Sequence, residues 1–383
     1  MDRRELGIYV HIPFCLKKCA YCDFLSFPAK KDTQRAYFRA LREEIAAFSP
    51  EGGMEAVSVY FGGGTPSLPD AEEIVRTLET VRGVFSLSAD AEITIECNPG
   101  TLDGEKPGAY KEAGFNRLSL GLQSMDNDLL RTLGRIHTRE RFLEEYRNAR
   151  GAGFENINVD LMYGLPGQSL SSFARTLSEV ISLKPEHISA YGLMIEEGTP
   201  FWERYHEDDL AKQRGDKPLF LPDEEEEGRM TDLMKKTLRK NGIFRYEISN
   251  YARRGRESRH NTGYWKRREY AGFGLGASGQ IGKIRYRNTS ILEEYLKHPG
   301  MREEETSLTR EDEIAETLIL GLRMTEGVDL RLFQECFGIR AEDLFREQIG
   351  RFLEEGLLEM SDDHLRLTER GFDVSNLVMC TFV

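Results

Sequence analysis

The sequence is poor in cysteine and in long apolar runs. Six cysteines in 383 residues do not suggest the disulfide framework of a secreted domain, and this usage fits a reducing cytosol. No uninterrupted apolar stretch approaches the ~20 residues of a membrane-spanning helix. The first residues contain no apolar signal core. We therefore expect a cytoplasmic protein with no transmembrane segment, and peripheral contact with a membrane stays open.

The chain also lacks an excess of positive charge. Its formal net charge is −13, which argues against general nucleic-acid binding, because that activity needs a basic face. A local basic pocket for an anionic ligand stays possible. The hydrophobic content of 39% is ordinary for a globular chain with a real core.

Three of the six cysteines, Cys15, Cys19 and Cys22, lie on one short loop with the spacing C-x3-C-x2-C. Three thiolates so placed can hold three irons of a cubic [4Fe–4S] cluster and leave the fourth iron open to a substrate. The alternative is a zinc site with His11 as a fourth ligand. Zinc sites commonly use two separated pairs of ligands, and no second cysteine pair follows in this chain.

Apolar runs alternate with amphipathic stretches in the first half of the chain. Strand-like runs occupy residues 7–11, 57–61, 93–97, 118–122, 157–162 and 188–193. Helix-like segments include residues 32–48 and 70–84, the latter with Asp70 as a plausible N-cap. This alternation predicts an α/β fold with parallel strands and crossover helices, either an open or a closed barrel. In such barrels the chemistry collects at the carboxyl ends of the strands.

The pattern changes after about residue 200. Residues 202–223 are charged and irregular and suggest a loop-rich insertion or lid, residues 224–239 are helical, and residues 253–268 are strongly basic. The last unit has two or three helices and ends in a β-hairpin that turns at Ser361, a winged-helix-like pattern. We predict three domains: a barrel at 1–200, a barrel extension at 201–306, and a C-terminal helical α+β module at 307–383.

Several polar residues follow or end the predicted strands. Gly63, Gly64 and Thr65 come after the second strand, where glycine permits close approach of the backbone to a ligand. The third, fourth and fifth strands carry Glu96, Gln123 and Asp160. A polar group in an apolar strand needs a partner, so each could belong to a buried ion pair that braces the barrel. Three such residues on successive strands instead indicate a polar ligand at the barrel mouth. Arg135 could pair there with a carboxylate of the ligand in fork geometry.

The motifs YVHIPFC…C..C, FGGGTPS, NRLSLGLQS, LGRIH and DLMYGLPGQ resemble the radical S-adenosylmethionine (SAM) superfamily, in its oxygen-independent coproporphyrinogen III oxidase-like branch. The resemblance covers nearly the whole chain and implies a partial (β/α)6 barrel. It implies that SAM chelates the open iron and is cleaved to a 5′-deoxyadenosyl radical. It also implies SAM contacts at Tyr9, Tyr21, Gly63, Gly64, Thr65, Glu96, Gln123, Arg135 and Asp160.

Two features set the chain apart from the oxidase itself. That enzyme carries a further cysteine two residues after the third, where this chain has Phe24. It also has a long extension before its cysteines, whereas fourteen residues precede Cys15 here. Both differences speak against coproporphyrinogen decarboxylation.

The segment His260-Asn-Thr-Gly-Tyr-Trp265 is similar to the H-N-x-x-Y-W motif of the HemW heme chaperones. The resemblance implies heme contacts at His260, Asn261, Tyr264 and Trp265. An imidazole can ligate heme iron, and aromatic rings can pack on a porphyrin face. Nearby arginines could meet the heme propionates, namely Arg253, Arg254, Arg256 and Arg259. The alternative is that His260 and Trp265 only cap and pack the edge of the sheet.

The prediction is therefore a radical SAM protein that binds heme, a [4Fe–4S] cluster and SAM and delivers heme to hemoproteins, chiefly respiratory ones. No residue is assigned to catalysis, and a homodimer stays open. One alternative is a radical SAM enzyme acting on a porphyrin, by coproporphyrinogen III decarboxylation or heme modification. Another is a non-catalytic, zinc-stabilised barrel that binds partners.

Overall fold

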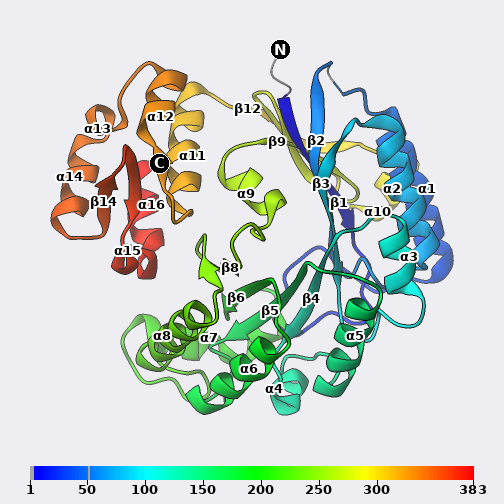
Figure 1. Cartoon of the computed structure of the whole chain (residues 1–383), viewed down its shortest axis with the longest axis horizontal. Coiled ribbons are helices and arrows are strands. Elements are labelled where there is room, and N and C mark those ends of the chain that lie inside the picture. Colours follow the sequence, from blue (N-terminus) through cyan, green and yellow to red (C-terminus); the bar gives the residue numbers. More distant parts are fainter. Residues whose placement is uncertain (1–3, 51) are drawn as a thin grey trace.

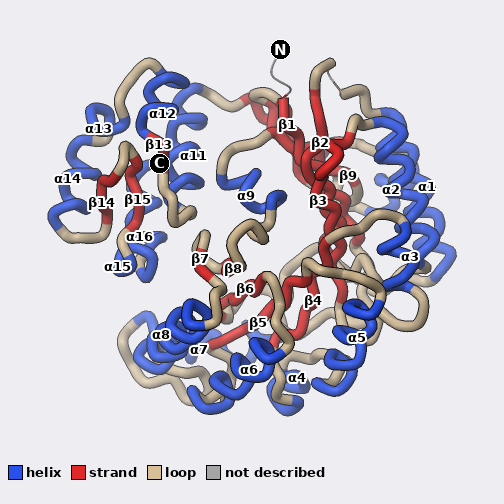
Figure 2. The backbone as a smooth tube through the Cα atoms, in the orientation of Figure 1, coloured by secondary structure: helices blue, strands red, loops and turns tan. Residues whose placement is uncertain are grey.

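The computed structural model describes residues 4–50 and 52–383. Its dominant feature is a curved twelve-stranded sheet with the order β12-β11-β10-β9-β1-β2-β3-β4-β5-β6-β8-β7 (Figures 1 and 2). The strands that build it are β1 (Arg4–Ile12), β2 (Met54–Gly63), β3 (Leu87–Cys97), β4 (Arg117–Gln123), β5 (Ile157–Tyr163), β6 (His187–Gly192), β7 (Phe244–Arg245), β8 (Asn250–Ala252), β9 (Glu269–Phe273), β10 (Ser278–Ile281), β11 (Ile284–Asn288) and β12 (Arg302–Ser307).

Neighbours from β9 through β1 to β6 pair in parallel, and the pairs at both ends of the sheet are antiparallel. Helices connect the parallel strands and cover the outer face of the sheet (Figure 1). They are α1 (Lys31–Ala47), α2 (Ala71–Val84), α3 (Lys106–Glu112), α4 (Asn127–Thr132), α5 (Arg139–Gly151) and α6 (Leu170–Ser182). The predicted α/β partial barrel of six strand–helix units is confirmed.

Helix α1 shows why these segments cover the sheet. Tyr37, Phe38, Leu41 and Ile45 are fully buried and recur at helical spacing, so they form one apolar stripe. That stripe belongs to the main core, which also holds the apolar residues of β1 and β2. Strand β4 is buried over its whole length, as expected for a strand with helices on one side and a filled interior on the other.

Helix α2 begins at Ala71, as predicted, with Asp70 at the N-cap position. However, the Asp70 side chain makes no capping hydrogen bond. Its carboxylate instead accepts a hydrogen bond from Lys31 Nζ at 3.2 Å. An ion pair with the start of α1 has replaced the local cap.

The prediction of a loop-rich segment at 202–223 is wrong for its first half, which forms α7 (Pro200–Gln213). Thr199 caps this helix by accepting a hydrogen bond from Trp202 N at 3.1 Å, and Pro200 occupies its first turn. Within α7 only Phe201 and Asp208 are buried, so no apolar stripe marks the helix in the sequence. Asp208 accepts hydrogen bonds from three successive backbone N–H groups, those of residues 219–221, and ties the following loop to α7.

The remaining helices before the last module are α8 (Glu224–Lys240), α9 (Arg259–Trp265) and α10 (Leu292–Lys297). Helix α8 confirms the helix expected at 224–239. Figure 1 shows α9 on the inner side of the curved sheet, between its two arms. This short helix carries the H-N-x-x-Y-W motif, so the motif lies inside the barrel and not on its outer surface.

The C-terminal module has a separate apolar core, built from residues between Ile314 and Phe382. Its elements are α11 (Arg310–Leu322), β13 (Val328–Asp329), α12 (Leu330–Phe337), α13 (Ala341–Leu344), α14 (Arg346–Glu354), β14 (Leu358–Ser361), β15 (His364–Leu367), α15 (Glu369–Asp373), α16 (Ser375–Met379) and the 3-10 turn at Cys380–Phe382. The predicted hairpin is β14–β15, and its turn residues Asp362 and Asp363 have positive φ. None of the described helices is long and apolar enough to cross a membrane.

Candidate functional site

A cavity of about 460 Å³ opens at the carboxyl ends of β1 to β6. The three cysteines of the C-x3-C-x2-C loop line it, as do eight of the nine residues that the sequence analysis assigns to SAM. Those eight are Tyr21, Gly63, Gly64, Thr65, Glu96, Gln123, Arg135 and Asp160. We call this the cysteine-loop cavity. The parallel register explains the convergence, because it sets Ile12 beside Gly63 and Gly121 beside Asp160.

Backbone hydrogen bonds hold the cysteine loop over this cavity. Cys15 N donates to Phe27 O at 3.1 Å, and Ala20 N donates to Leu133 O at 3.0 Å. All three thiols are free. Among residues 4–50 and 52–383, no three His, Cys, Asp or Glu side chains gather as they would around one metal ion. In a cubane each thiolate binds a different iron, so the ligand assignment rests on the spacing and on the shared cavity. It stays a prediction.

The glycines of the FGGGTPS motif let the β2 loop lie against the cysteine loop. Gly63 has φ 116°, and a Cβ atom there would come within 2.6 Å of the His11 ring. A Cβ atom on Gly64 would lie 2.9 Å from Phe14 O and 3.1 Å from Cys15 Sγ. Any larger residue at position 64 would therefore push against backbone that carries a cysteine.

Glu96 lines the cavity near the end of β3. Its Oε1 atom accepts a hydrogen bond from Tyr60 OH at 2.7 Å, and its Oε2 atom accepts one from Gly63 N at 3.1 Å. Burial, and next the negative charge of Asp160, raise the pKa of Glu96 to about 7, while the Tyr60 and Gly63 hydrogen bonds oppose the shift. The carboxyl group is thus poised to change charge near neutral pH.

Asp160 of β5 also lines the cavity. It accepts hydrogen bonds from Asn158 Nδ2 at 2.7 Å and from Ser119 Oγ at 3.3 Å. Burial raises its pKa above the ordinary value, against the lowering effect of Asn158. Gln123, at the end of β4, also lines the cavity and has φ 68°, a left-handed conformation that a residue with a side chain adopts at some cost.

Arg135 brings a positive charge to the cavity beside the cysteine loop. Its guanidinium donates to Asn98 Oδ1 at 2.8 Å, to Gly121 O and to Cys19 Sγ at 3.5 Å. Its buried Nε atom finds no hydrogen-bond partner within residues 4–50 and 52–383. Thiols, cationic side chains that include Arg135, and carboxylates that include Glu96 and Asp160 therefore line one cavity. This donor set fits a [4Fe–4S] cluster together with a ligand that carries amino, carboxylate and hydroxyl groups.

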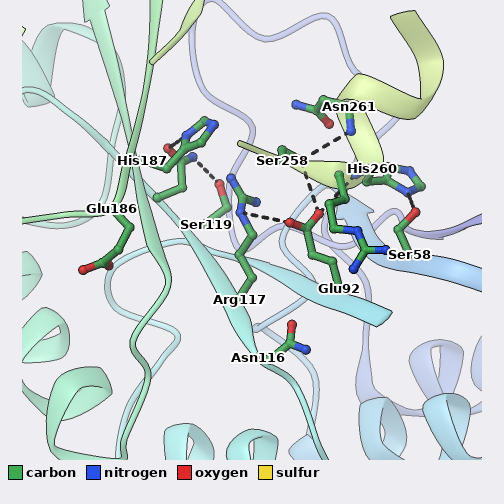
Figure 3. A network of polar contacts seen from close by, with 12 residues as sticks. Ser58, Glu92, Asn116, Arg117, Ser119, Glu186, His187, Ser258, His260 and Asn261 are labelled. Carbon is green, nitrogen blue, oxygen red and sulfur yellow. Dashed lines mark hydrogen bonds and ion pairs between the residues drawn. The ribbon is translucent and has the colours of Figure 1, made fainter. Parts of the chain in front are cut away.

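The structure adds cavity residues that the sequence analysis did not single out, namely Asn98, Arg117, Ser119 and Asn158. Arg117 is almost fully buried and lies 3.9 Å from the buried carboxylate of Glu92 (Figure 3). Three of these residues could have been found from strand periodicity. Arg117 and Ser119 share the inward face of β4 with Gln123, and Asn158 shares that of β5 with Asp160.

The ninth SAM candidate, Tyr9, lies elsewhere. It lines a second cavity of about 610 Å³ on the inner side of β1, β9 and β10. Tyr264 and Trp265 of α9 also line it, so we call it the α9 cavity. Phe24, Gly63 and Glu96 line both cavities, which therefore share a wall.

The heme candidates are divided between the two cavities, because Tyr264 and Trp265 line the α9 cavity and Asn261 lines the cysteine-loop cavity. His260 lines neither. Its Nδ1 atom lies 3.0 Å from Ser58 Oγ (Figure 3). Its Nε2 atom lies 2.9 Å from Tyr264 OH, and its ring stacks on Tyr60. Burial, with Arg268 next, lowers the pKa of His260 to about 3. Both ring nitrogens are thus engaged, and ligation of iron would require at least one of these hydrogen bonds to break.

The arginine-rich run lies apart from both cavities. Arg253 donates to Pro185 O at 3.2 Å, Arg254 stacks on Phe244, and Arg259 pairs with Asp90 at 3.0 Å. None of Arg253, Arg254, Arg256 and Arg259 lines either cavity in the described part of the chain. The proposed role of this run at heme propionates has no support from its position.

Comparison with known proteins gives consistent results. Residues 9–180 match the family described as the radical SAM superfamily, and residues 308–374 match the HemN C-terminal domain. The heme chaperone HemW of Bacillus subtilis is 36% identical over 98% of each chain. The heme chaperone HemW of Lactococcus lactis is 36% identical over 100% of this chain and 98% of its own. The solved structure of Escherichia coli coproporphyrinogen III oxidase (HemN), a radical SAM enzyme, has a TM-score of 0.83 at 25% identity and covers 100% of this chain and 91% of its own.

Proposed function

The chain belongs to the radical SAM superfamily and, within it, to the HemW family, and on this basis we propose that it is a heme chaperone that binds heme and delivers it to hemoproteins. The observation that carries the proposal is the match to curated heme chaperones, which runs over both chains almost end to end. Such coverage includes the α9 segment and the C-terminal module as well as the barrel.

For the barrel mouth we propose that Cys15, Cys19 and Cys22 hold a [4Fe–4S] cluster. SAM would contact Tyr21, Gly63, Gly64, Thr65, Glu96, Gln123, Arg135 and Asp160. When bound, the cluster supplies an electron that can cleave SAM. The protein residues bind and orient SAM. Arg135 can donate hydrogen bonds to its carboxylate, Glu96 and Asp160 can accept hydrogen bonds from its amino or hydroxyl groups, and the glycines allow SAM to approach the backbone closely.

Tyr9 is proposed to act indirectly. Its hydroxyl lies 3.0 Å from His11 Nδ1, and the His11 ring packs close to Gly63. A SAM contact at Tyr9 would need the ligand to pass the shared wall, so we assign Tyr9 to the support of that wall.

The test of the function is heme titration followed by transfer. The anaerobically reconstituted protein should bind hemin with a Soret shift and then lose it to an apo form of a b-type cytochrome. Albumin serves as a control acceptor, because simple heme release would fill albumin equally well. Absence of hemin binding, or equal transfer to both acceptors, contradicts the proposal.

A second candidate function is a radical SAM enzyme that acts on a porphyrin. The observation that favours it is the TM-score of 0.83 with coproporphyrinogen III oxidase over the whole chain. Incubation with coproporphyrinogen III, SAM and a reductant decides between the two. Formation of protoporphyrinogen IX and CO2 would establish the enzyme, and Phe24 in place of a cysteine is our reason to expect neither product.

We further propose that the recipients are hemoproteins of the respiratory chain and that the protein acts in the cytoplasm as a homodimer, with peripheral contact to the membrane. The low cysteine content supports the compartment. Light scattering of the cluster-loaded and apo forms tests the dimer, and flotation with lipid vesicles tests the membrane contact.

A further inference from the structure

We propose that Asn98 is a positioning residue for the cluster, because it aims two hydrogen-bond donors at two of the three cysteine sulfurs. The donors are the hydroxyl of Thr65 and the guanidinium of Arg135. Through them Asn98 sets the reduction potential of the cluster. This role rests on the proposed function, in which the cysteine loop holds a [4Fe–4S] cluster. It adds a residue outside the ligand set and the property that this residue controls.

The side chain of Asn98 bridges the β2 loop and the segment that carries Arg135. Its Nδ2 atom donates a hydrogen bond to Thr65 Oγ1 at 2.8 Å, and its Oδ1 atom accepts one from Arg135 Nη2 at 2.8 Å. A flipped amide would set its NH2 group against the guanidinium, which has donors only. The two partners therefore fix the orientation of the amide in the wall of the cysteine-loop cavity.

Both partners of Asn98 reach a cysteine sulfur. Thr65 Oγ1 lies 3.4 Å from Cys15 Sγ, and Arg135 Nη1 donates to Cys19 Sγ at 3.5 Å. A thiolate has no proton to give, so the Thr65 hydroxyl must be the donor to it. The hydroxyl proton is available for this bond, because Asn98 Nδ2 already donates to the hydroxyl oxygen. Asn98 thus sets the direction of the chain from amide to hydroxyl to sulfur.

The backbone of Asn98 is held in place by its neighbours. Its N–H donates to Ser67 Oγ at 3.3 Å, and its carbonyl accepts hydrogen bonds from Thr101 N at 3.0 Å and from Thr101 Oγ1 at 2.7 Å. Pro99 follows directly and restricts the backbone conformation of Asn98. The amide therefore meets its two side-chain partners from a fixed position, as a positioning residue must.

Hydrogen bonds to the sulfurs of an iron–sulfur cluster are one of the factors that set its reduction potential. Reduction adds one electron without making or breaking a bond, so the reduced cluster carries one more negative charge and binds donors more strongly. The cationic donor Arg135 contributes more than the neutral hydroxyl of Thr65. With both donors in place, the cluster is easier to reduce than it is without them.

The experiment measures the midpoint potential of the full-length, cluster-loaded protein without SAM, by titration with dithionite under EPR. Asn98→Ala releases both donors, so the midpoint should fall. At the midpoint of the parent, the ratio of reduced to oxidised cluster should drop by at least about tenfold, and a tenfold change corresponds to about 59 mV for one electron. Thr65→Val removes only the hydroxyl and should lower the midpoint less, whereas Thr65→Ser keeps a hydroxyl and should match the parent.

A double variant tests whether the two residues act through one chain of hydrogen bonds. Asn98→Ala/Thr65→Val should have the midpoint of Asn98→Ala alone, because loss of the amide has already released the hydroxyl. The matched control is Thr94→Val in β3. It removes a buried hydroxyl that lines neither cavity and has no hydrogen-bond partner among the described residues, so the midpoint should not change.

An unchanged midpoint in cluster-loaded Asn98→Ala overturns this inference and leaves the cluster and the heme chaperone function standing. If Asn98→Ala does not retain the cluster, the comparison of Thr65→Val with Thr65→Ser decides, and equal midpoints for these two variants overturn the inference. Fully additive shifts in the double variant overturn the bridge as well. A parent protein without a four-iron cluster overturns the cluster assignment together with this inference, and the separate hemin transfer assay still tests the chaperone function.

Discussion

The two cavities share a wall and differ in almost everything else. Thiols, carboxylates and amides line the cysteine-loop cavity, and they come from the ends of successive parallel strands. Aromatic rings and guanidinium groups line the α9 cavity, and they come chiefly from β1, α9, the loop that follows α9, β9 and β11. The first lining suits a metal cluster and a small polar ligand, whereas the second suits a flat apolar body with negative edges. A single barrel thus offers two sites of opposite chemical character side by side.

The largest expected effect is loss of the cluster from the cysteine-loop cavity without a change in hemin binding. Replacement Cys19→Ala removes one of the three proposed iron ligands, so we expect the four-iron cluster to be lost, as measured by iron and sulfide content and by EPR. Hemin titration of the same variant should stay close to that of the parent. Cys336→Ala, which removes an exposed cysteine outside the cavities, is the control and should retain the cluster. A full iron count in the Cys19→Ala protein would refute the ligand assignment.

A smaller effect is expected from Gly64→Ala, which tests the close contact between the β2 loop and the cysteine loop. The added Cβ atom would meet backbone atoms of Phe14 and Pro13 at 2.9–3.0 Å, so the cysteine loop must shift. We expect partial cluster loading and weaker SAM binding by calorimetry, again with little change in hemin affinity. Gly83→Ala is a matched control, because nothing lies within 4 Å of its Cβ position in α2. Parent-like loading of Gly64→Ala would show that the contact is dispensable.

The reciprocal test is the double replacement His260→Ala/Trp265→Ala in α9. The double replacement removes the Trp265 ring from the cavity and the hydrogen bond between His260 and Tyr264. Hemin affinity should therefore fall by about tenfold while the cluster assembles normally. Ser58→Ala removes a hydrogen bond to His260 but lines neither cavity, and it should leave hemin binding nearly unchanged. If titration of the double variant matches the parent, heme binds elsewhere.

The smallest effect concerns the shared wall. With a folded pKa of about 7 against an ordinary value of 4.5, Glu96 holds a proton in the folded state that it has released in the unfolded state. This contribution to stability is complete below pH 4.5 and is lost as the pH rises through 7. Between pH 6 and pH 8 the unfolding free energy of the apo protein should fall by about 1 kcal/mol more in the parent than in Glu96→Gln. Parallel pH profiles from urea unfolding would show that Glu96 does not titrate in this range.

Much of the cysteine-loop cavity could be predicted because its signals are local. The cysteine spacing, the glycine triplet and the polar residues at strand ends each lie within a few residues, and parallel strands bring such ends together. The SAM assignment of Tyr9 stays a prediction: Tyr9 lines the α9 cavity, and its hydroxyl lies 3.0 Å from His11 Nδ1.

The α9 cavity could not be predicted in the same way. The sequence drew attention to the arginines from Arg253 to Arg259, yet the arginines that line the cavity are Arg267 and Arg268, which follow α9, and Arg285 of β11. His260 looked available as a ligand because its partner Ser58 lies 202 residues away in the chain. Helix α7 was not predicted for a related reason: its buried Asp208 accepts hydrogen bonds from the following loop and adds no apolar stripe to the helix.

The wall that Phe24, Gly63 and Glu96 form between the two cavities has a thermodynamic consequence. If SAM and heme occupy its two sides as proposed, both contact the same few residues, and the free energies of their binding are coupled. Linkage is symmetric: whatever factor SAM applies to the dissociation constant of heme, heme must apply to that of SAM. Binding of one ligand would then change the affinity for the other through the shared wall alone, without movement of a domain.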